Sequence, residues 1–229
     1  MSVSLARTPA LIAACLWGGA GIIWLVLEAI TASAFPGYSY AHNYISDLGV
    51  PDVAVFEGRS IDSPLSAVMN FAFIAQGLLL VGGVVFALRA ARTATGRMRK
   101  WILAVAIVHA VGMLLVGIFH GSQANLENGL LLLHGLGAAL AIITGNLTTI
   151  MVGFTSHRIG ARPWYRGTSI VLGIVGLICL VMLLIASTTS IATLPEAVWE
   201  RGSVYSIIGW ELVTAISLLA STRRGSRLA

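Results

Sequence analysis

Residues 168–190 read TSIVLGIVGLICLVMLLIASTTS, and this stretch contains no charged residue. An apolar run of about 20 residues is long enough to cross the hydrocarbon core of a bilayer as a helix. Five further runs of this kind occur along the chain, so that the six runs span residues 9–33, 64–89, 101–119, 129–154, 168–190 and 204–222. We therefore predict an all-α integral membrane bundle of six transmembrane helices, folded as a single domain over residues 1–229.

The overall composition agrees with this prediction. Hydrophobic residues make up 57% of the chain and charged residues 10%, whereas soluble domains carry about 25% charged residues. The continuous runs exclude a transmembrane β-barrel, whose strands are short and alternate in polarity. The first run is longer than the core of a signal peptide, which has about 7–15 residues, so we expect it to be retained as a helix.

Basic residues lie almost entirely on one side of the predicted bundle. Twelve of the 14 Lys and Arg residues fall before the first helix, after the last, or in the loops between helices 2 and 3 and between helices 4 and 5: Arg7, Arg89, Arg92, Arg97, Arg99, Lys100, Arg158, Arg162, Arg166, Arg223, Arg224 and Arg227. Only Arg59 and Arg201 lie on the other side. The positive-inside rule then predicts that both termini are cytoplasmic. The orientation of the helices in the membrane therefore explains the excess of basic residues, and we expect no nucleic-acid partner.

Polar chemistry gathers on the opposite, outer side. The longest loop, residues 34–63, lies there together with most of the acidic residues, and long loops in compact proteins are often functional. Ionisable side chains inside a membrane segment usually face the bundle interior or a wet cavity. We therefore predict a ligand pocket that opens to the outer leaflet and is formed by Glu28, His42, Asn43, Ser46, Asp47, Asn70, His134 and Glu211.

Each of these residues also has a structural interpretation. Ser46 and Asp47 are helix-capping residue types, and Asp47 can form an ion pair with Arg201, beside Glu200, or with Arg59. A pair between Asp47 and Arg201 would hold the long loop over the helices. His109 is expected to be a hydrogen-bonded core histidine, and the Asn side chains in the helices to bond between helices.

A metal site is a weaker interpretation of the same residues. His42, Asp47, His120 and His134 would supply three imidazoles and a carboxylate, which is a plausible zinc set. No dense spacing of histidines supports it, and we do not favour a metal. The chain also lacks a G-x-S-x-G elbow, a P-loop and a C-x-x-C pair. We therefore expect no cofactor.

Four stretches carry a resemblance to a known family: YAHNYISDLGVPD (40–52), SPLSAVMNFAFIAQGLLL (63–80), VGIFHGSQANLENGLLLLHGLGA (116–138) and WERGSVYSIIGWEL (199–212). They resemble the bacterial and archaeal DUF998 family (domain of unknown function 998), whose members have an SDLG element after the first of six helices. The family's Asn and Gly of the second helix match Asn70 and Gly77, and its last-helix element matches Glu200, Arg201 and Trp210. His120 stands where the family usually has a proline.

A more distant similarity runs to the DRAM autophagy modulators and the GPI-anchor remodelling factors, which have six helices and a comparable loop. These resemblances imply a multi-pass protein of a prokaryotic plasma membrane that handles membrane lipids. The leading hypothesis is that the protein binds or remodels a lipid or small amphiphile in the outer pocket. A metal-dependent membrane hydrolase and a non-catalytic assembly subunit remain as alternatives, so the sequence leaves open whether the protein is an enzyme.

Overall fold

The computed structural model of the protein describes residues 6–91, 96–156, 161–189 and 194–225. The chain is 80% helical, and six of the helices in its described part are long and apolar enough to cross a membrane. These six are α1 (Arg7–Ala34), α2 (Ser66–Ala90), α3 (Arg97–Ile118), α5 (Leu131–Thr155), α6 (Pro163–Thr188) and α7 (Glu196–Gly225). The predicted all-α membrane bundle is confirmed.

The largest difference from the predicted boundaries is at α7, which begins at Glu196 rather than at residue 204. The first turns of α7 carry charged residues, which an apolar-run search rejects. They are helical because they pack beneath the long loop, where Ala197 is 1% and Arg201 is 7% exposed. Four residues used in the sequence analysis lie outside the described residues: Arg92, Arg158, Ser190 and Arg227.

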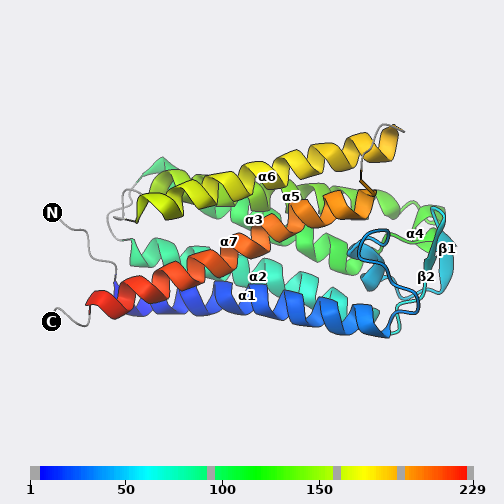
Figure 1. Ribbon diagram of the computed structural model, residues 1–229, viewed down its shortest axis with the longest axis horizontal. Helices are drawn as coiled ribbons and strands as arrows, with labels where there is room; N and C mark the ends of the chain where they lie inside the picture. Colours follow the sequence, from blue (N-terminus) through cyan, green and yellow to red (C-terminus); the bar gives the residue numbers. More distant parts are fainter. Residues whose placement is uncertain (1–5, 92–95, 157–160, 190–193, 226–229) are drawn as a thin grey trace.

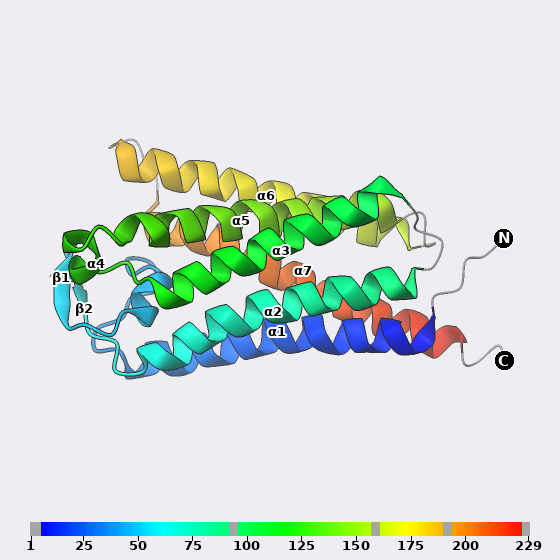
Figure 2. The same ribbon diagram turned by 180° about the vertical axis from the view of Figure 1, so that it is seen from behind.

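The six long helices form a closed ring. Each packs on the next in chain order, and α7 returns to pack on α1 while also touching α5. Figures 1 and 2 show the bundle from two sides, with the start of α1 and the end of α7 at the same end. We call this the terminal end, and the opposite end, which carries the long loop, the loop end.

Short elements cover the loop end: a 3₁₀ turn η1 (Ser46–Gly49), an antiparallel hairpin of β1 (Ala54–Phe56) and β2 (Arg59–Ile61), and α4 (Gln123–Glu127). The hairpin turns at Glu57 and Gly58, both with positive φ, which is the conformation that two-residue hairpin turns need. Val50, Phe56 and Ile61 pack together under the hairpin. The predicted loop is therefore a folded cap rather than a flexible connection.

Glycines allow α3 and α5 to pack at very close range. A Cβ at Gly112 would lie 2.5 Å from the backbone nitrogen of Ala141, and one at Gly137 would lie 2.7 Å from the Cβ of Leu115. Small residues at such crossings drive helix association in membranes, because lipid offers no hydrophobic force between helices. This contact therefore fixes the spacing of the bundle on the side of α3.

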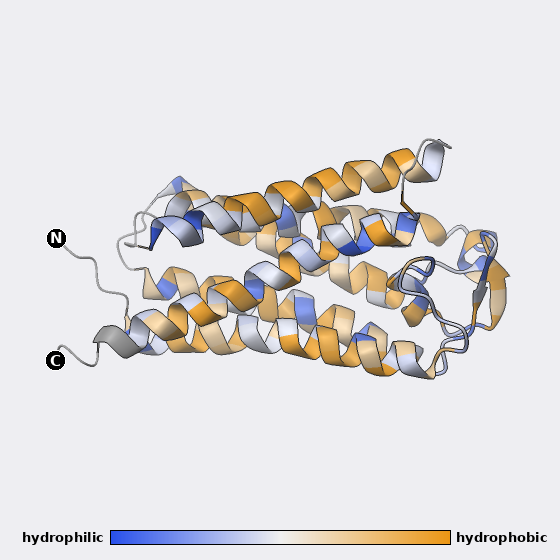
Figure 3. Ribbon diagram, in the orientation of Figure 1, coloured by the Kyte–Doolittle hydropathy of each residue, from blue (hydrophilic) through white to orange (hydrophobic). Residues whose placement is uncertain are grey.

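The outer surface of the helices matches a lipid environment. Figure 3 shows mostly hydrophobic residues between the two ends of the bundle. On α6, large apolar side chains such as Val171, Ile178 and Leu184 are more than half exposed. The cytoplasmic position of the termini stays a prediction from the positive-inside rule.

We expect Gly112→Ala to lower the thermal unfolding temperature in detergent. The added methyl meets backbone atoms that cannot rotate away, and overpacking of this kind costs about 1–3 kcal/mol. The matched control is Gly135→Ala on α5, where a Cβ meets nothing within 4 Å. The control should be neutral or slightly stabilising. Equal unfolding temperatures for the two variants would contradict the close packing of α3 on α5.

Candidate functional site

A buried arginine ties the long loop to the helices. The Arg201 guanidinium donates to the carbonyl oxygen of Asn43 at 2.7 Å and to the hydroxyl of Tyr38, and it lies 3.8 Å from Glu28 Oε1. Burial raises the pKa of Tyr38, so its hydroxyl stays neutral. A buried cation is tolerated only with such partners. Arg201 therefore joins α1, α7 and the loop through one charge.

The predicted ion pair of Asp47 with Arg201 is wrong, because Asp47 pairs with Arg59. Asp47 Oδ2 lies 3.0 Å from Arg59 Nε and also accepts the backbone N–H of Tyr44 at 3.0 Å. The hairpin places Arg59 next to η1, whereas Arg201 donates its hydrogen bonds to Asn43 and Tyr38. Burial lowers the pKa of Arg59, but the charge of Asp47, its hydrogen bond to Arg59, and the nearby Tyr44 and Glu57 together outweigh burial, so the pKa lies above its ordinary value. The pair holds the hairpin on η1.

Glu28 and Glu200 act as acceptors at the loop end. The Glu28 carboxylate accepts the indole N–H of Trp24 at 2.9 Å and the hydroxyl of Tyr205 at 2.8 Å. Glu200 accepts the backbone N–H of Ile45 at 2.6 Å. Glu200 was predicted as an ion-pair residue beside Arg201, and its hydrogen bond goes to the loop backbone. Both carboxylates therefore anchor elements of the fold.

The remaining polar residues of the loop end are also bonded to neighbours. Asn70 donates its amide to the carbonyl of Gly49 at 2.8 Å, and the same nitrogen lies 3.1 Å from His120 Nε2. His134 Nδ1 donates to the carbonyl of Phe119 at 2.8 Å. Burial lowers the pKa of His120 below its ordinary value, and Asp52 opposes this. His42 is exposed at the surface.

The structure brings only some of the predicted pocket residues together. Of the eight, Ser46 and His134 line a cavity of about 50 Å³ inside the loop end, together with Glu200. That volume holds water molecules but not an amphiphile. Glu211 lies in another group, fully buried, where it accepts the side-chain amide of Gln76 at 3.1 Å. The eight predicted residues thus serve several separate contacts rather than one pocket of ligand size.

The weak metal candidates are likewise apart. Within residues 6–91, 96–156, 161–189 and 194–225, no three His, Cys, Asp or Glu side chains are grouped so that they could hold a metal ion. His120 and His134 are engaged as described above, and Asp47 is paired with Arg59.

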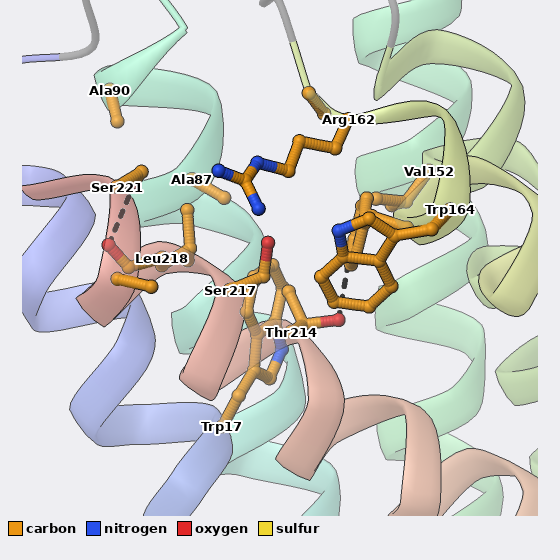
Figure 4. Close-up of a pocket in the computed structure, with 13 residues that line it drawn as sticks. Trp17, Ala87, Ala90, Val152, Arg162, Trp164, Thr214, Ser217, Leu218 and Ser221 are labelled. Atoms are coloured by element: carbon orange, nitrogen blue, oxygen red, sulfur yellow. Dashed lines mark hydrogen bonds between the residues drawn. The ribbon is translucent and has the colours of Figure 1, made fainter.

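Two larger spaces lie near the ends of the bundle. One is an open groove of about 330 Å³ at the loop end, lined in part by His42, Tyr44, Arg59 and Glu196. The other is a cleft at the terminal end. Figure 4 shows this cleft, which has a volume of about 320 Å³ and receives side chains from α1, α2, α5, α6 and α7. Its walls are mainly apolar: Trp17, Ala87, Ala90, Val152, Trp164 and Leu218. Its polar lining is Arg162, Tyr165, Thr214, Ser217 and Ser221. We call it the basic-end cleft.

Local sequence explains how the cleft is built. Thr214, Ser217 and Ser221 are spaced by three and four residues, so their hydroxyls share one face of α7. Arg162 precedes Pro163 at the start of α6, and its side chain extends over Ser217 at the mouth in Figure 4. The floor is Trp17, whose indole N–H donates to the carbonyl of Leu80 at 3.2 Å.

This cleft was not predicted from the sequence, because the prediction followed acidic residues and histidines, and the only charged residue among the described residues that line the cleft is Arg162. A signal was present in the hydroxyl residues at positions 214, 217 and 221, which fall on one face of α7 near its end. Five helices must be assembled before the alanines and tryptophans of the walls come together, and no spacing along the chain shows that.

Comparison with known proteins gives one match. A family model described as "Protein of unknown function (DUF998)" matches residues 19–217. No curated protein and no solved structure matches the chain. The more distant similarity to the DRAM and GPI-remodelling proteins stays a prediction.

Arg201→Gln should destabilise the protein by about 3–5 kcal/mol, because it leaves Glu28 buried without its counter-charge. Arg59→Gln, which changes a partly exposed arginine, should cost about 2 kcal/mol. Chemical unfolding in detergent measures both. An Arg59 variant that costs as much as the Arg201 variant would contradict the central place given to Arg201.

Acid should weaken the loop end through His120. Since its pKa in the folded state lies below the ordinary value of 6.5, the unfolded chain binds more protons below that pH and stability falls as the pH falls. Protonation of His120 also places an N–H donor at Nε2, opposite the amide nitrogen of Asn70, which is itself a donor. We expect His120→Gln to lose less stability than the native protein between about pH 7.5 and 5.5. The control is His42→Gln, which changes an exposed histidine. If His120→Gln loses as much stability as the native protein over this pH range, His120 is not the group responsible.

Proposed function

Because this chain belongs to the DUF998 family, whose description gives no activity, we propose a function from its own geometry: it binds an anionic lipid or other anionic amphiphile in the basic-end cleft. The observation that carries the proposal is a cleft of ligand size, with apolar walls and a single arginine at its mouth. The protein is a multi-pass membrane protein, so lipids reach such a cleft directly from the bilayer.

The size and the walls favour an amphiphile. Small-molecule sites have volumes of about 300–1,000 Å³ and are lined mostly by apolar side chains with a few placed polar groups. The basic-end cleft has about 320 Å³ and this composition. An acyl chain between Trp17 and Leu218 would bury apolar surface of both partners. At the loop end, the inner cavity has only about 50 Å³. An open groove there has a similar volume of about 330 Å³, but most of its lining residues are polar or charged, so it offers an acyl chain less apolar surface: His42, Tyr44, Arg59 and Glu196.

The charge favours an anion. No hydrogen bond or ion pair joins the Arg162 guanidinium to another side chain in the described part of the protein. Guanidinium groups bind phosphate and carboxylate through two parallel hydrogen bonds. The hydroxyl of Ser217 adds a donor close by, whereas the hydroxyl of Ser221 donates to the carbonyl of Leu218 at 2.8 Å. By the positive-inside rule the cleft opens to the cytoplasmic leaflet, which is rich in anionic lipids.

Binding is a better interpretation of the cleft than catalysis. No His, Asp, Glu or Cys occurs among the described residues that line it, so a general base or a metal ligand is not at hand. The hydrolase hypothesis would require the loop-end histidines, which are engaged as backbone and amide partners. A non-catalytic assembly subunit needs no cavity of ligand size. The presence of a cleft of this volume therefore disfavours that hypothesis.

We expect Arg162→Gln to weaken binding of a short-chain phosphatidic acid about tenfold or more, since a hydrogen bond to a charged group contributes about 1.5–3 kcal/mol. Native mass spectrometry of the purified protein, titrated with phosphatidic acid and with phosphatidylcholine, measures the change. Binding of phosphatidylcholine should change much less.

The matched control is Arg166→Gln. Arg166 lies one turn further along α6, against the ring of Phe154, and does not line the cleft. Ser217→Phe fills the cleft and should abolish binding of both lipids. If Arg166→Gln weakens binding as much as Arg162→Gln, or if Ser217→Phe binds normally, the cleft is not the lipid site.

A further inference from the structure

Three polar side chains meet in the middle of the helix bundle, away from the basic-end cleft. They are Gln76 on α2, His109 on α3 and Glu211 on α7, and each is at most 2% exposed. Burial of polar groups at membrane depth is costly, and such groups usually mark a functional site. Their hydrogen-bond roles determine how many protons they carry.

One nitrogen of His109 has a fixed role. Its Nδ1 lies 2.7 Å from the carbonyl oxygen of Ala141. A carbonyl oxygen only accepts, so Nδ1 carries a hydrogen. In a neutral imidazole the other nitrogen, Nε2, must then be an acceptor. That nitrogen lies 2.9 Å from the side-chain amide of Gln76, whose other end lies 3.1 Å from Glu211 Oε1.

When the amide oxygen of Gln76 faces His109, it needs a donor on Nε2. His109 is then an imidazolium with hydrogens on both nitrogens. The amide nitrogen faces Glu211 and donates to it, so the carboxyl group can be ionised. In this arrangement His109 holds the proton.

When the amide of Gln76 is turned over, its nitrogen donates to Nε2 and His109 is neutral. The amide oxygen then faces Glu211 Oε1, and two oxygens at 3.1 Å need a hydrogen between them. Glu211 must supply it as a carboxylic acid. In this arrangement Glu211 holds the proton.

Without that proton, neither orientation of the amide works. A neutral His109 and an ionised Glu211 both offer only acceptors to Gln76, which has donors at one end only. One contact is therefore always acceptor against acceptor, which is costly in a site without water. We propose that His109, Gln76 and Glu211 form a buried proton-binding site, which holds one proton on His109 or on Glu211, and that the orientation of the Gln76 amide follows which of the two holds it.

The surroundings show that the site is built for these groups. A Cβ at Gly145 on α5 would lie 2.8 Å from His109 Nδ1, so a glycine makes the room that the ring occupies. Glu211 Oε2 has no hydrogen-bond partner among the described residues, although it is fully buried. An atom of this kind is a free acceptor that can take up or release a proton.

The site lies between the two ends of the protein. His109 borders a cavity of about 30 Å³ on the side of the loop end. Glu211 is three residues from Thr214 of the basic-end cleft, about 4.5 Å along the helix. The helices packed around the cluster carry further buried or half-buried titratable side chains, among them Glu28 on α1, His134 on α5, Tyr165 on α6, and Glu200, Arg201 and Tyr205 on α7. Their hydrogen bonds go elsewhere. Cys179 on α6 and the basic residues of the terminal end complete the set of titratable side chains, together with Arg7 and Cys15 on α1 and Glu196 on α7.

Spectroscopy of the whole protein in detergent at about pH 8.5, two units above the ordinary pKa of histidine, tests the proposal. Nitrogen NMR of histidine-labelled protein detects an imidazolium, with His109 assigned by its loss in His109→Asn. Infrared spectroscopy detects the carbonyl stretch of a carboxylic acid, with Glu211 assigned by its loss in Glu211→Gln. Glu28→Gln is the matched carboxyl control.

The expected result is that one of the two signals is present at this pH, or that both are present as a mixture adding up to one proton. In Glu211→Gln the second acid is gone, the glutamine can satisfy either end of the Gln76 amide, and His109 should become neutral. A neutral His109 together with an ionised Glu211 in the native protein would overturn the proposal. The result does not depend on lipid binding, so this test is independent of the proposed function of the cleft.

Discussion

The hydrocarbon core of a bilayer offers no water, so most polar groups of a membrane-spanning bundle find their partners within the protein. This constraint accounts for most of the specific contacts of the structure. Arg201 is buried because Asn43, Tyr38 and Glu28 surround it, and Glu28 in turn is held by Trp24 and Tyr205. The network joins helices that would otherwise meet only through apolar packing, which resembles packing against lipid. Polar contacts thus specify which helices are neighbours.

The two ends of the bundle meet this constraint in different ways. At the loop end, the buried carboxylates and histidines are engaged with the cap, and the cavities inside it are small. The larger groove beside His42 is open, and its arginine, Arg59, is already paired with Asp47. At the terminal end, Arg162 has no such partner in the described part of the chain, and it stands over a cleft of about 320 Å³. A group that is satisfied within the protein stabilises the fold, whereas an unpaired charge beside an apolar space is available to a ligand. The candidate site therefore lies where the protein leaves its polar chemistry incomplete.

The sequence predicted the fold well because hydropathy acts over single segments. Six apolar runs gave six helices, although the charged first turns of α7 were missed since they are buried by the cap. Pairing was harder, because Arg59 and Arg201 are both possible partners of Asp47 until the hairpin is known. The cleft was not predictable either, because its walls come from five helices whose arrangement the sequence does not show. The core histidine was expected, but its link to Glu211 through Gln76 depends on how α2, α3 and α7 are assembled.

The central claim is that the basic-end cleft, and not the loop end, receives an anionic amphiphile. Density for the protein purified from native membranes and imaged in lipid nanodiscs tests this most directly. The account predicts elongated non-protein density between Trp17 and Leu218, with its head beside Arg162. A cleft closed by side chains, together with ligand density among Glu28, His134 and Glu200, would contradict it.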